Sequence, residues 1–407
     1  MSTVPQDQPL IYYPFTPEFM EDPYPHYAEL RRQVPVHEHP GGFWMLSRYA
    51  DVDALLRSKH SVDQRHVAPG PFRDAYARAG VSEKPRLKGL ALLDLDPPDH
   101  TRLRKLVTKA FTVRAINGLE PMVRELVDEA LDGIAAAGGG DLVEELAFPL
   151  PFTVMTRMLG MPPIDTKHLR MLTSLLMRSV ELTTDPEVMR VIEAADAEIF
   201  EVVGDAVSRK RDDPGDDLLT ALIAAEDDGD TLSHDELVAQ VTTLFVAGYE
   251  TTVNLISGGT LALLRNPDQL ELLRARPGIG ENAVEEMLRY DPPTHSSRRI
   301  TLEPYHVGGY EIPAGSMVLA NLAAANRDEE FFGPDAEELR LERENARKQL
   351  SFGGGMHYCL GGALARIEGR VAIGELVRRF PGLAMDGPVE WNGLLTLRGA
   401  ERLPIRV

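Results

Sequence analysis

Cysteine is almost absent from this chain: Cys359 is the only one in 407 residues. A single cysteine excludes an intrachain disulfide and a zinc site built from several thiolates. Low cysteine content also agrees with a reducing compartment. The thiol can still be a small buried side chain, a nucleophile beside a base, or the single ligand of a metal.

Long apolar runs are missing as well. No stretch near the N-terminus has about twenty consecutive apolar residues, and no basic segment leads into an apolar one. We therefore expect a cytoplasmic protein with no membrane anchor. The net charge is −20. Because nucleic-acid binding needs a basic surface, this charge argues against nucleic acid as the main partner.

Repeats, low-complexity tracts and Ser/Gly linkers are also absent, so we expect one α-rich domain over residues 1–407. Pattern and turn residues predict helices at 24–32 and 50–58, and a hairpin of strands at 34–37 and 43–47. Residues 61–90 are rich in proline and glycine and are expected to form an irregular loop. A nearly continuous helical pattern follows over 113–228, with expected breaks at 138–140, 149–151, 162–163 and 214–215.

The residues around Cys359 have an unusual composition. Gly353 to Gly355 precede it, and glycine permits tight turns and a close approach to a bound group. From Ala363 to Val377 the apolar residues recur at helical spacing, so Cys359 lies at or just before a helix N-terminus. The helix dipole and free N–H groups there stabilise a thiolate, which is the form that binds metals. A nucleophilic thiol with His357 as its base is the alternative.

The longest predicted helix spans 233–266 and starts with a capping box. In its apolar middle, Gly248, Glu250 and Thr251 interrupt the pattern. A mid-helix glycine costs about 1 kcal/mol relative to alanine, and a buried carboxylate costs more unless it is paired. The motif therefore suggests a function; the alternative is a helix bend in which Thr251 bonds back to a carbonyl.

The pattern Phe352-x-x-Gly355-x-His357-x-Cys359-x-Gly361 resembles the haem-binding loop of the cytochromes P450, the haem-thiolate monooxygenases. Four further segments resemble motifs of that family in the right order. They are DPPDHTRLRKLVTKAFT from Asp96, Ala247-Gly248-x-Glu250-Thr251, Glu286-x-x-Arg289, and Ala325-Asn326-Arg327-Asp328.

The resemblance implies haem b as the cofactor, with Cys359 as the metal ligand. It implies that Glu250 and Thr251 are catalytic and deliver protons, and that Glu286 and Arg289 form a structural ion pair. The implied cofactor-binding residues are His100, Arg104, Ala247, Gly248, Arg299, Phe352, Gly353, His357, Cys359 and Gly361. One departure is Gln349, where many relatives have a propionate-binding histidine; glutamine can donate a hydrogen bond but no charge.

The implied fold is the cytochrome P450 fold: a single large triangular domain, mainly α, with a small β-rich region formed mainly from N- and C-terminal strands. The helices between Pro162 and Arg211 are implied to form a movable lid. The implied function is insertion of one oxygen atom from O2 into an organic small molecule, a specialised metabolite, by hydroxylation or epoxidation. Coupling, desaturation, peroxide-driven chemistry and a haem-based sensor remain alternatives, although a sensor has no need for Glu250 and Thr251.

The predicted substrate pocket includes His295, Leu244, Leu394 and Leu395. His295 is four residues before Arg299, so in an extended chain the two share a side. If Arg299 reaches a haem propionate, His295 faces the pocket and suggests a polar or anionic group on the substrate. The alternative is that His295 turns to a propionate, to water or to a backbone partner.

Electrons are expected from a ferredoxin and a ferredoxin reductase supplied by NAD(P)H, since the chain has no flavin fingerprint. An acidic ferredoxin would need a basic docking face on this acidic protein. The residues expected to form that face are Arg102, Lys105, Lys109, Arg343, Arg347 and Lys348.

Overall fold

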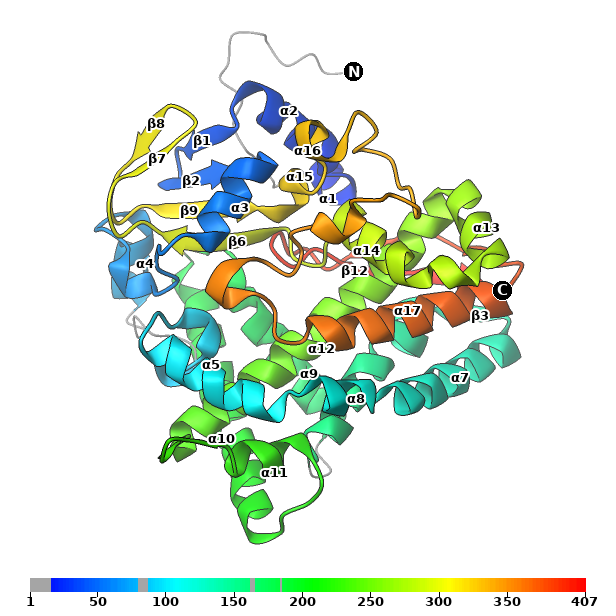
Figure 1. Cartoon of the computed structure of the whole chain (residues 1–407), viewed down its shortest axis with the longest axis horizontal. Helices are drawn as coiled ribbons and strands as arrows, with labels where there is room; N and C mark the ends of the chain where they lie inside the picture. The colour runs from blue at the N-terminus through cyan, green and yellow to red at the C-terminus, as the bar shows by residue number, and fades with distance from the viewer. Residues whose placement is uncertain (1–15, 80–86, 162–164, 184) are drawn as a thin grey trace.

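The computed structural model describes residues 16–79, 87–161, 165–183 and 185–407. Its longest helix, α12 (His234–Arg265), crosses the middle of a body of helices (Figure 1). Ser233 and Glu236 form the predicted capping box at its start. Buried side chains lie all around its circumference, as expected of a core helix.

Helices pack around α12 on several sides: α8, α10, α14 and α17 all contact it. The main core that results includes residues from Leu87 to Ile405. Within the described ranges, no helix has the length and apolar character needed to cross a membrane. The other helices are α1 (Pro17–Glu21), α2 (Tyr24–Gln33), α3 (Tyr49–Arg57), α4 (Pro71–Ala79), α5 (Asp99–Ala110), α6 (Val113–Asn117), α7 (Glu120–Ala137), α8 (Pro149–Met158), α9 (Thr166–Met177), α10 (Pro186–Asp212), α11 (Leu218–Ile223), α13 (Pro267–Ala275), α14 (Gly280–Tyr290), α15 (Leu322–Ala325), α16 (Glu329–Phe332) and α17 (Gly362–Arg379).

The strands of the largest sheet and the β7–β8 hairpin lie at the upper left of Figure 1, whereas β3 and β12 lie toward its right side. The largest sheet has the order β1-β2-β9-β6, in which β2 and β9 are parallel and the other pairs are antiparallel. The C-terminal strands β10 and β13 form a second sheet with β3. The strands are β1 (Val36–His39), β2 (Phe43–Leu46), β3 (Gly139–Asp141), β4 (Glu226–Asp227), β5 (Asp230–Thr231), β6 (Ser296–Ile300), β7 (Tyr305–Val307), β8 (Tyr310–Ile312), β9 (Met317–Asn321), β10 (Ala384–Met385), β11 (Glu390–Trp391), β12 (Ala400–Arg402) and β13 (Pro404–Arg406).

The four-stranded sheet carries apolar side chains on both faces. Successive side chains of a strand point to opposite faces, and in β2 and β9 both sets are apolar. Leu46 and Val318 face a cluster that includes Leu55 and Leu56 of α3. Phe43, Met45, Met317 and Leu319 face a second cluster that includes Tyr27 of α2. The sheet is therefore enclosed by helices and loops on both sides. Both clusters draw on N-terminal residues and on residues after 300.

The expectation of an irregular loop over 61–90 is wrong in part, because Pro71–Ala79 forms α4. Proline is well tolerated in the first turn of a helix, and Ala75, Ala77 and Ala79 are strong helix formers. The predicted break at 149–151 is present: a preceding helical segment ends at Ala147, and a new helix, α8, begins at Pro149. The predicted break at 162–163 lies outside the described residues.

Candidate active site

The loop before Cys359 is closed by a hydrogen bond from the Cys359 N–H to the Phe352 carbonyl at 2.9 Å. Gly353 and Gly355 have φ values of 71° and 64°, which side chains disfavour. A Cβ at Gly355 would also lie 2.7 Å from the carbonyl oxygen of Leu56, at the end of α3. Gly353 is therefore required by the turn, and Gly355 both by the turn and by the close approach of this loop to α3.

Helix α17 begins three residues after Cys359, as the sequence predicts. The backbone N–H groups of Gly361 and Gly362 hydrogen-bond to the thiol sulfur. The Cys359 side chain is solvent-accessible, yet the surrounding protein desolvates the thiol and so raises its pKa. The two N–H groups and the charges of Arg104 and Arg366 act in the opposite direction and lower that pKa. A bound cation would reverse this balance, because a coordinating thiol is deprotonated outright.

A cluster of basic side chains lies next to this loop. The imidazole rings of His100, on α5, and His357 are 4.2 Å apart, and the Nε2 atom of each is buried without a hydrogen-bond partner among the described residues. Burial and the charges of His100, Arg299 and Arg104 lower the pKa of His357 to about 3. Both effects disfavour a charged His357 unless an anion lies beside it.

Arg299 has no hydrogen bond to a carboxylate among the described residues. Its guanidinium is buried and donates to neutral acceptors, the Leu56 carbonyl at 3.3 Å and the Ser297 hydroxyl at 3.2 Å. Burial lowers its pKa to about 10. The nearby acid Asp96 accepts hydrogen bonds from Ser61 and Val62. The cluster therefore suits an anionic ligand with carboxylate groups.

The centre of α12 carries the predicted catalytic pair. Burial raises the pKa of Glu250 to about 7. The negative charge of Glu401 adds to this rise, and the positive charge of Arg170 opposes it. This value suits a group that both gives and takes protons near neutral pH. The Thr251 hydroxyl donates to the Ala247 carbonyl at 2.9 Å, which is the bond expected from the helix-bend alternative. Both residues remain candidates for proton transfer.

Gly248 lies against a side chain of α8. A Cβ at this position would lie 2.8 Å from the sulfur of Met155. A larger residue here would displace the flexible end of Met155, a contact that the sequence did not suggest. The predicted place of Gly248 beside the cofactor remains a prediction, as does that of Ala247.

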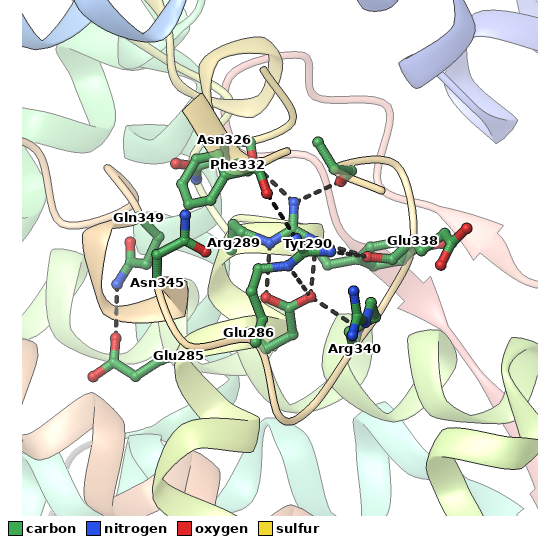
Figure 2. A network of polar contacts seen from close by, with 12 residues as sticks. Glu285, Glu286, Arg289, Tyr290, Asn326, Phe332, Glu338, Arg340, Asn345 and Gln349 are labelled. Atoms are coloured by element: carbon green, nitrogen blue, oxygen red, sulfur yellow. Dashed lines mark hydrogen bonds and ion pairs between the residues drawn. The ribbon is translucent and has the colours of Figure 1, made fainter. Parts of the chain in front are cut away.

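Glu286 and Arg289 form a buried ion pair on α14, with Arg289 Nε 2.7 Å and Nη2 2.8 Å from the carboxylate (Figure 2). The remaining N–H groups of Arg289 donate to the carbonyls of Asn326, Ala336 and Glu338. All five donors are therefore used. The pair ties α14 to the segment that leads to the cysteine loop, and its role as a structural pair stays a prediction.

Gln349 lies nearby and donates to Glu285 at 3.0 Å (Figure 2). Glu285 also accepts a hydrogen bond from Arg366, on α17, at 2.6 Å. In this arrangement Gln349 connects the segment before the cysteine loop with α14 and α17. Its amide N–H is engaged by protein, in place of the propionate contact that the resemblance associates with this position.

The structure contradicts the expectation that His295 faces a substrate pocket. Its ring is 2% exposed and lies beside the rings of Tyr24 and Tyr27. Its Nδ1 is 3.2 Å from the Tyr27 hydroxyl, and its Nε2 is 3.6 Å from Asp291. The alternation argument failed because β6 begins at Ser296, so it does not extend to His295.

The predicted basic docking face is only partly present. Arg343 is buried and binds Glu286 and Asp335, so its assignment to the surface is wrong. Arg102 is paired with Asp230 and Glu236. The residues that remain exposed are Lys105, Lys109, Arg347 and Lys348.

The other predicted pocket residues are partly buried. Leu244 and Leu394 pack against the main core, and Leu395 packs against the sheet cluster that includes Leu182. Sequence reasoning missed Glu181, which binds the backbone at Leu395. It also missed Gln240, a polar residue on the buried surface of α12 that could have been noticed there.

Comparison with known proteins decides the family. The cytochrome P450 family model matches residues 30–275 and 280–389. The chain belongs to the cytochrome P450 family. It is 40% identical to cytochrome P450 107B1 of Saccharopolyspora erythraea over 96% of each chain. It is also 40% identical to the monooxygenase PikC of Streptomyces venezuelae over 96% of this chain and 92% of that protein.

Solved structures agree with this assignment. The ligand-free P450 CYP164A2 of Mycobacterium smegmatis superposes with a TM-score of 0.87 at 35% identity, covering 96% of this chain and 97% of that one. The predicted fold class is therefore confirmed. This P450 is a monooxygenase, and its family uses a haem-thiolate cofactor, O2, reducing partners and small-molecule substrates.

Proposed function

We propose that this P450 hydroxylates or epoxidises an organic specialised metabolite, using haem b and electrons from a ferredoxin. The observation that carries the proposal is the basic cluster of His100, Arg299 and His357 beside the Cys359 loop, which has no paired carboxylate in the part of the chain that the structure describes. Two propionates would supply that negative charge. Residues 1–407 would act as one domain in the cytoplasm.

Each predicted residue has a separate task in this proposal. Haem bound through a thiolate would supply oxygen activation. Cys359 would provide that thiolate, stabilised by the Gly361 and Gly362 N–H groups. His100, Arg104 and Arg299 would hold the propionates. Gly353, His357 and Gly361 shape the loop, and the buried ring of Phe352 stacks on the Arg366 guanidinium at 4.2 Å.

Glu250 would hold a proton that the oxygen chemistry needs. Its pKa of about 7 allows the carboxyl to donate a proton and be recharged near neutral pH. The Thr251 hydroxyl, now bonded to the Ala247 carbonyl, would accept that proton and pass its own onward after a rotation about χ1. This pair favours oxygenation over peroxide-driven chemistry and sensing, neither of which requires a proton path.

The substrate class is inferred from relatives. Among them are a 6-deoxyerythronolide B hydroxylase and a vitamin D(3) 25-hydroxylase, each 40% identical. A panel of polyketide lactones and secosteroids is therefore the first to test by spectral titration of the ferric protein. Compounds that bind are then incubated with a ferredoxin, its reductase, NADH and isotope-labelled O2. One labelled oxygen atom in the product supports the proposal, whereas unlabelled coupled or desaturated products favour the alternatives.

We predict that Glu250→Gln removes a step in the pH profile. In the unmodified protein, the share of electrons that reach product should fall as pH rises from about 6 to about 8, because an ionised Glu250 no longer donates a proton. The variant should show a low and flat profile, with more hydrogen peroxide released. Product and peroxide are measured per NADH consumed. An unaltered profile would show that Glu250 takes no part in proton delivery.

We predict that Lys105→Glu with Lys109→Glu slows reduction by an acidic ferredoxin. Both lysines are on α5 and border an open hollow formed with Arg104 and Met356 of the cysteine loop. At low ionic strength the rate should fall about tenfold, and its salt dependence should flatten. Stopped-flow reduction measures both effects. Lys167→Glu, a single charge reversal of the same kind on the exposed surface of α9, is the control; equal slowing in both proteins would contradict docking at α5.

A further inference from the structure

Asp96 links two segments that lie beside the basic cluster. It precedes α5, and its carbonyl accepts a hydrogen bond of the first turn from the His100 N–H at 3.0 Å. Its half-buried side chain reaches an earlier loop, where Oδ1 accepts from the Val62 N–H at 3.0 Å and Oδ2 accepts from the Ser61 hydroxyl. One aspartate therefore attaches the helix that carries His100 to this loop.

Ser61 is attached in turn to β6. Ser61 and Ile300 form an antiparallel bridge, in which the Ser61 N–H donates to the Ile300 carbonyl at 2.9 Å and the Ile300 N–H donates to the Ser61 carbonyl at 2.7 Å. Ile300 directly follows Arg299 in the strand. Ser61, Val62 and Ile300 are all buried. The contacts of Asp96 thus extend from α5 to the strand residue next to Arg299.

A second acid, two residues earlier, contacts β6 on the other side of Arg299. Asp94 Oδ1 lies 3.3 Å from the Nη2 atom of Arg298. Both neighbours of Arg299 therefore contact the segment that leads into α5. Arg298 does so directly, and Ile300 does so through Ser61.

Asp96 also supplies negative charge next to the buried cations. Burial lowers the pKa of Arg299, and the charge of Asp96 opposes that lowering. Burial and the charge of Arg104 lower the pKa of His100, and Asp96 again acts in the opposite direction. Cations that share a buried site repel one another, and an opposite charge close by reduces that cost. Asp96 therefore acts on the cluster through its charge as well as through its hydrogen bonds.

We propose that Asp96 is a positioning residue for the cofactor: it fixes α5 against β6 and so keeps His100 and Arg299 in place to bind the propionates. The inference rests on the proposed function, because it concerns the residues that would bind haem b. Asp96 acts through those residues, by its hydrogen bonds to Ser61 and Val62 and by its charge. These partners lie 35 and 34 positions earlier in the chain, so the motif that begins at Asp96 does not reveal them.

Three variants separate the hydrogen bonds from the charge. Asp96→Ala removes both. Asp96→Asn removes the charge, but its amide oxygen can still accept from Val62 and its N–H group can donate to Ser61. Ser61→Ala keeps the charge and removes one hydrogen bond. The matched control is Asp99→Asn, because Asp99 is an exposed residue in the first turn of α5 and loses the same charge while Ser61 and Val62 still bind Asp96.

All four variants are compared with the unmodified protein in the haem-loaded state. Haem dissociation is followed optically as haem passes to an excess of apomyoglobin. Amide hydrogen exchange is measured at Val62 and Ile300, and the reduction potential is measured by redox titration. The carbon monoxide spectrum of the reduced protein is recorded in parallel.

In Asp96→Ala we expect haem to dissociate about a hundredfold faster, and in Asp96→Asn and Ser61→Ala about tenfold faster, the scale of one or two hydrogen bonds to a charged group. Exchange at Val62 and Ile300 should rise about tenfold in Asp96→Ala. The reduction potential should become more positive in Asp96→Asn and stay unchanged in Ser61→Ala, because loss of a negative charge favours the reduced cofactor. Asp99→Asn should match the unmodified protein.

Unchanged haem dissociation in Asp96→Ala and Ser61→Ala would overturn the inference. Equal potentials in Asp96→Asn and Ser61→Ala would also overturn it, since they would reduce Asp96 to a packing role, as would an equal effect of Asp99→Asn. If Asp96→Ala does not fold, Asp96→Asn and Ser61→Ala provide the same test. Absence of the thiolate signature in the unmodified protein would instead count against the proposed haem site, and exchange at Val62 and Ile300 would still test the connection through Asp96.

Discussion

Cys359→Ser is expected to abolish the thiolate signature in the carbon monoxide spectrum of the reduced protein and to lower turnover by about a thousandfold or more. Such a loss corresponds to about 4 kcal/mol of activation free energy. The physical reason is that a serine hydroxyl stays protonated where a thiol ionises, so it is a poor anionic ligand. The Gly361 and Gly362 N–H groups, which favour negative charge on sulfur, would face a neutral oxygen.

Tyr358→Phe is the matched control for this experiment. It removes one hydroxyl from the neighbouring residue, whose side chain is exposed. This variant should keep the thiolate signature and most of the turnover. If Cys359→Ser keeps an unaltered spectrum, the assignment of Cys359 as the axial ligand is wrong, and with it the centre of the proposed function.

Arg289→Met is expected to lower the free energy of unfolding by about 3–5 kcal/mol, the usual cost of breaking a buried ion pair by removing one partner. Both side chains are fully buried, so the variant leaves the Glu286 charge facing Arg343 alone. It also leaves the carbonyls of Asn326, Ala336 and Glu338 short of donors. Denaturant unfolding of the haem-loaded protein, followed by circular dichroism, measures the loss.

Arg276→Met provides the comparison, because Arg276 pairs with Glu342 at the surface, where both side chains are more than half exposed. An exposed pair contributes about 0–1 kcal/mol. Arg289→Lys should fall between the two, since lysine keeps the charge but has three donors and no planar fork. Equal stability of Arg289→Met and Arg276→Met would show that the buried network does not hold the cysteine-loop segment in place.

Local patterns predicted much of this fold. The limits of α12 followed from its capping box and from Pro267, and the cysteine loop followed from its glycines. What failed depends on contacts between distant segments. Arg343 looks like a surface charge in sequence, but the chain folds it against Glu286 and Asp335. Glu181 belongs to no motif, because its partners are backbone amides of a distant loop.

The place of α3 in this architecture has a consequence for building chimeras from related proteins. The Leu56 carbonyl accepts a hydrogen bond from Arg299 and also limits the space above Gly355. One backbone atom near the N-terminus therefore sets the position of both a β6 cation and the cysteine loop. A crossover between residues 57 and 298 would pair this atom with partners that did not evolve beside it. Segments 49–57 and 299–359 should be inherited together, even though more than 240 positions separate Leu56 from Arg299.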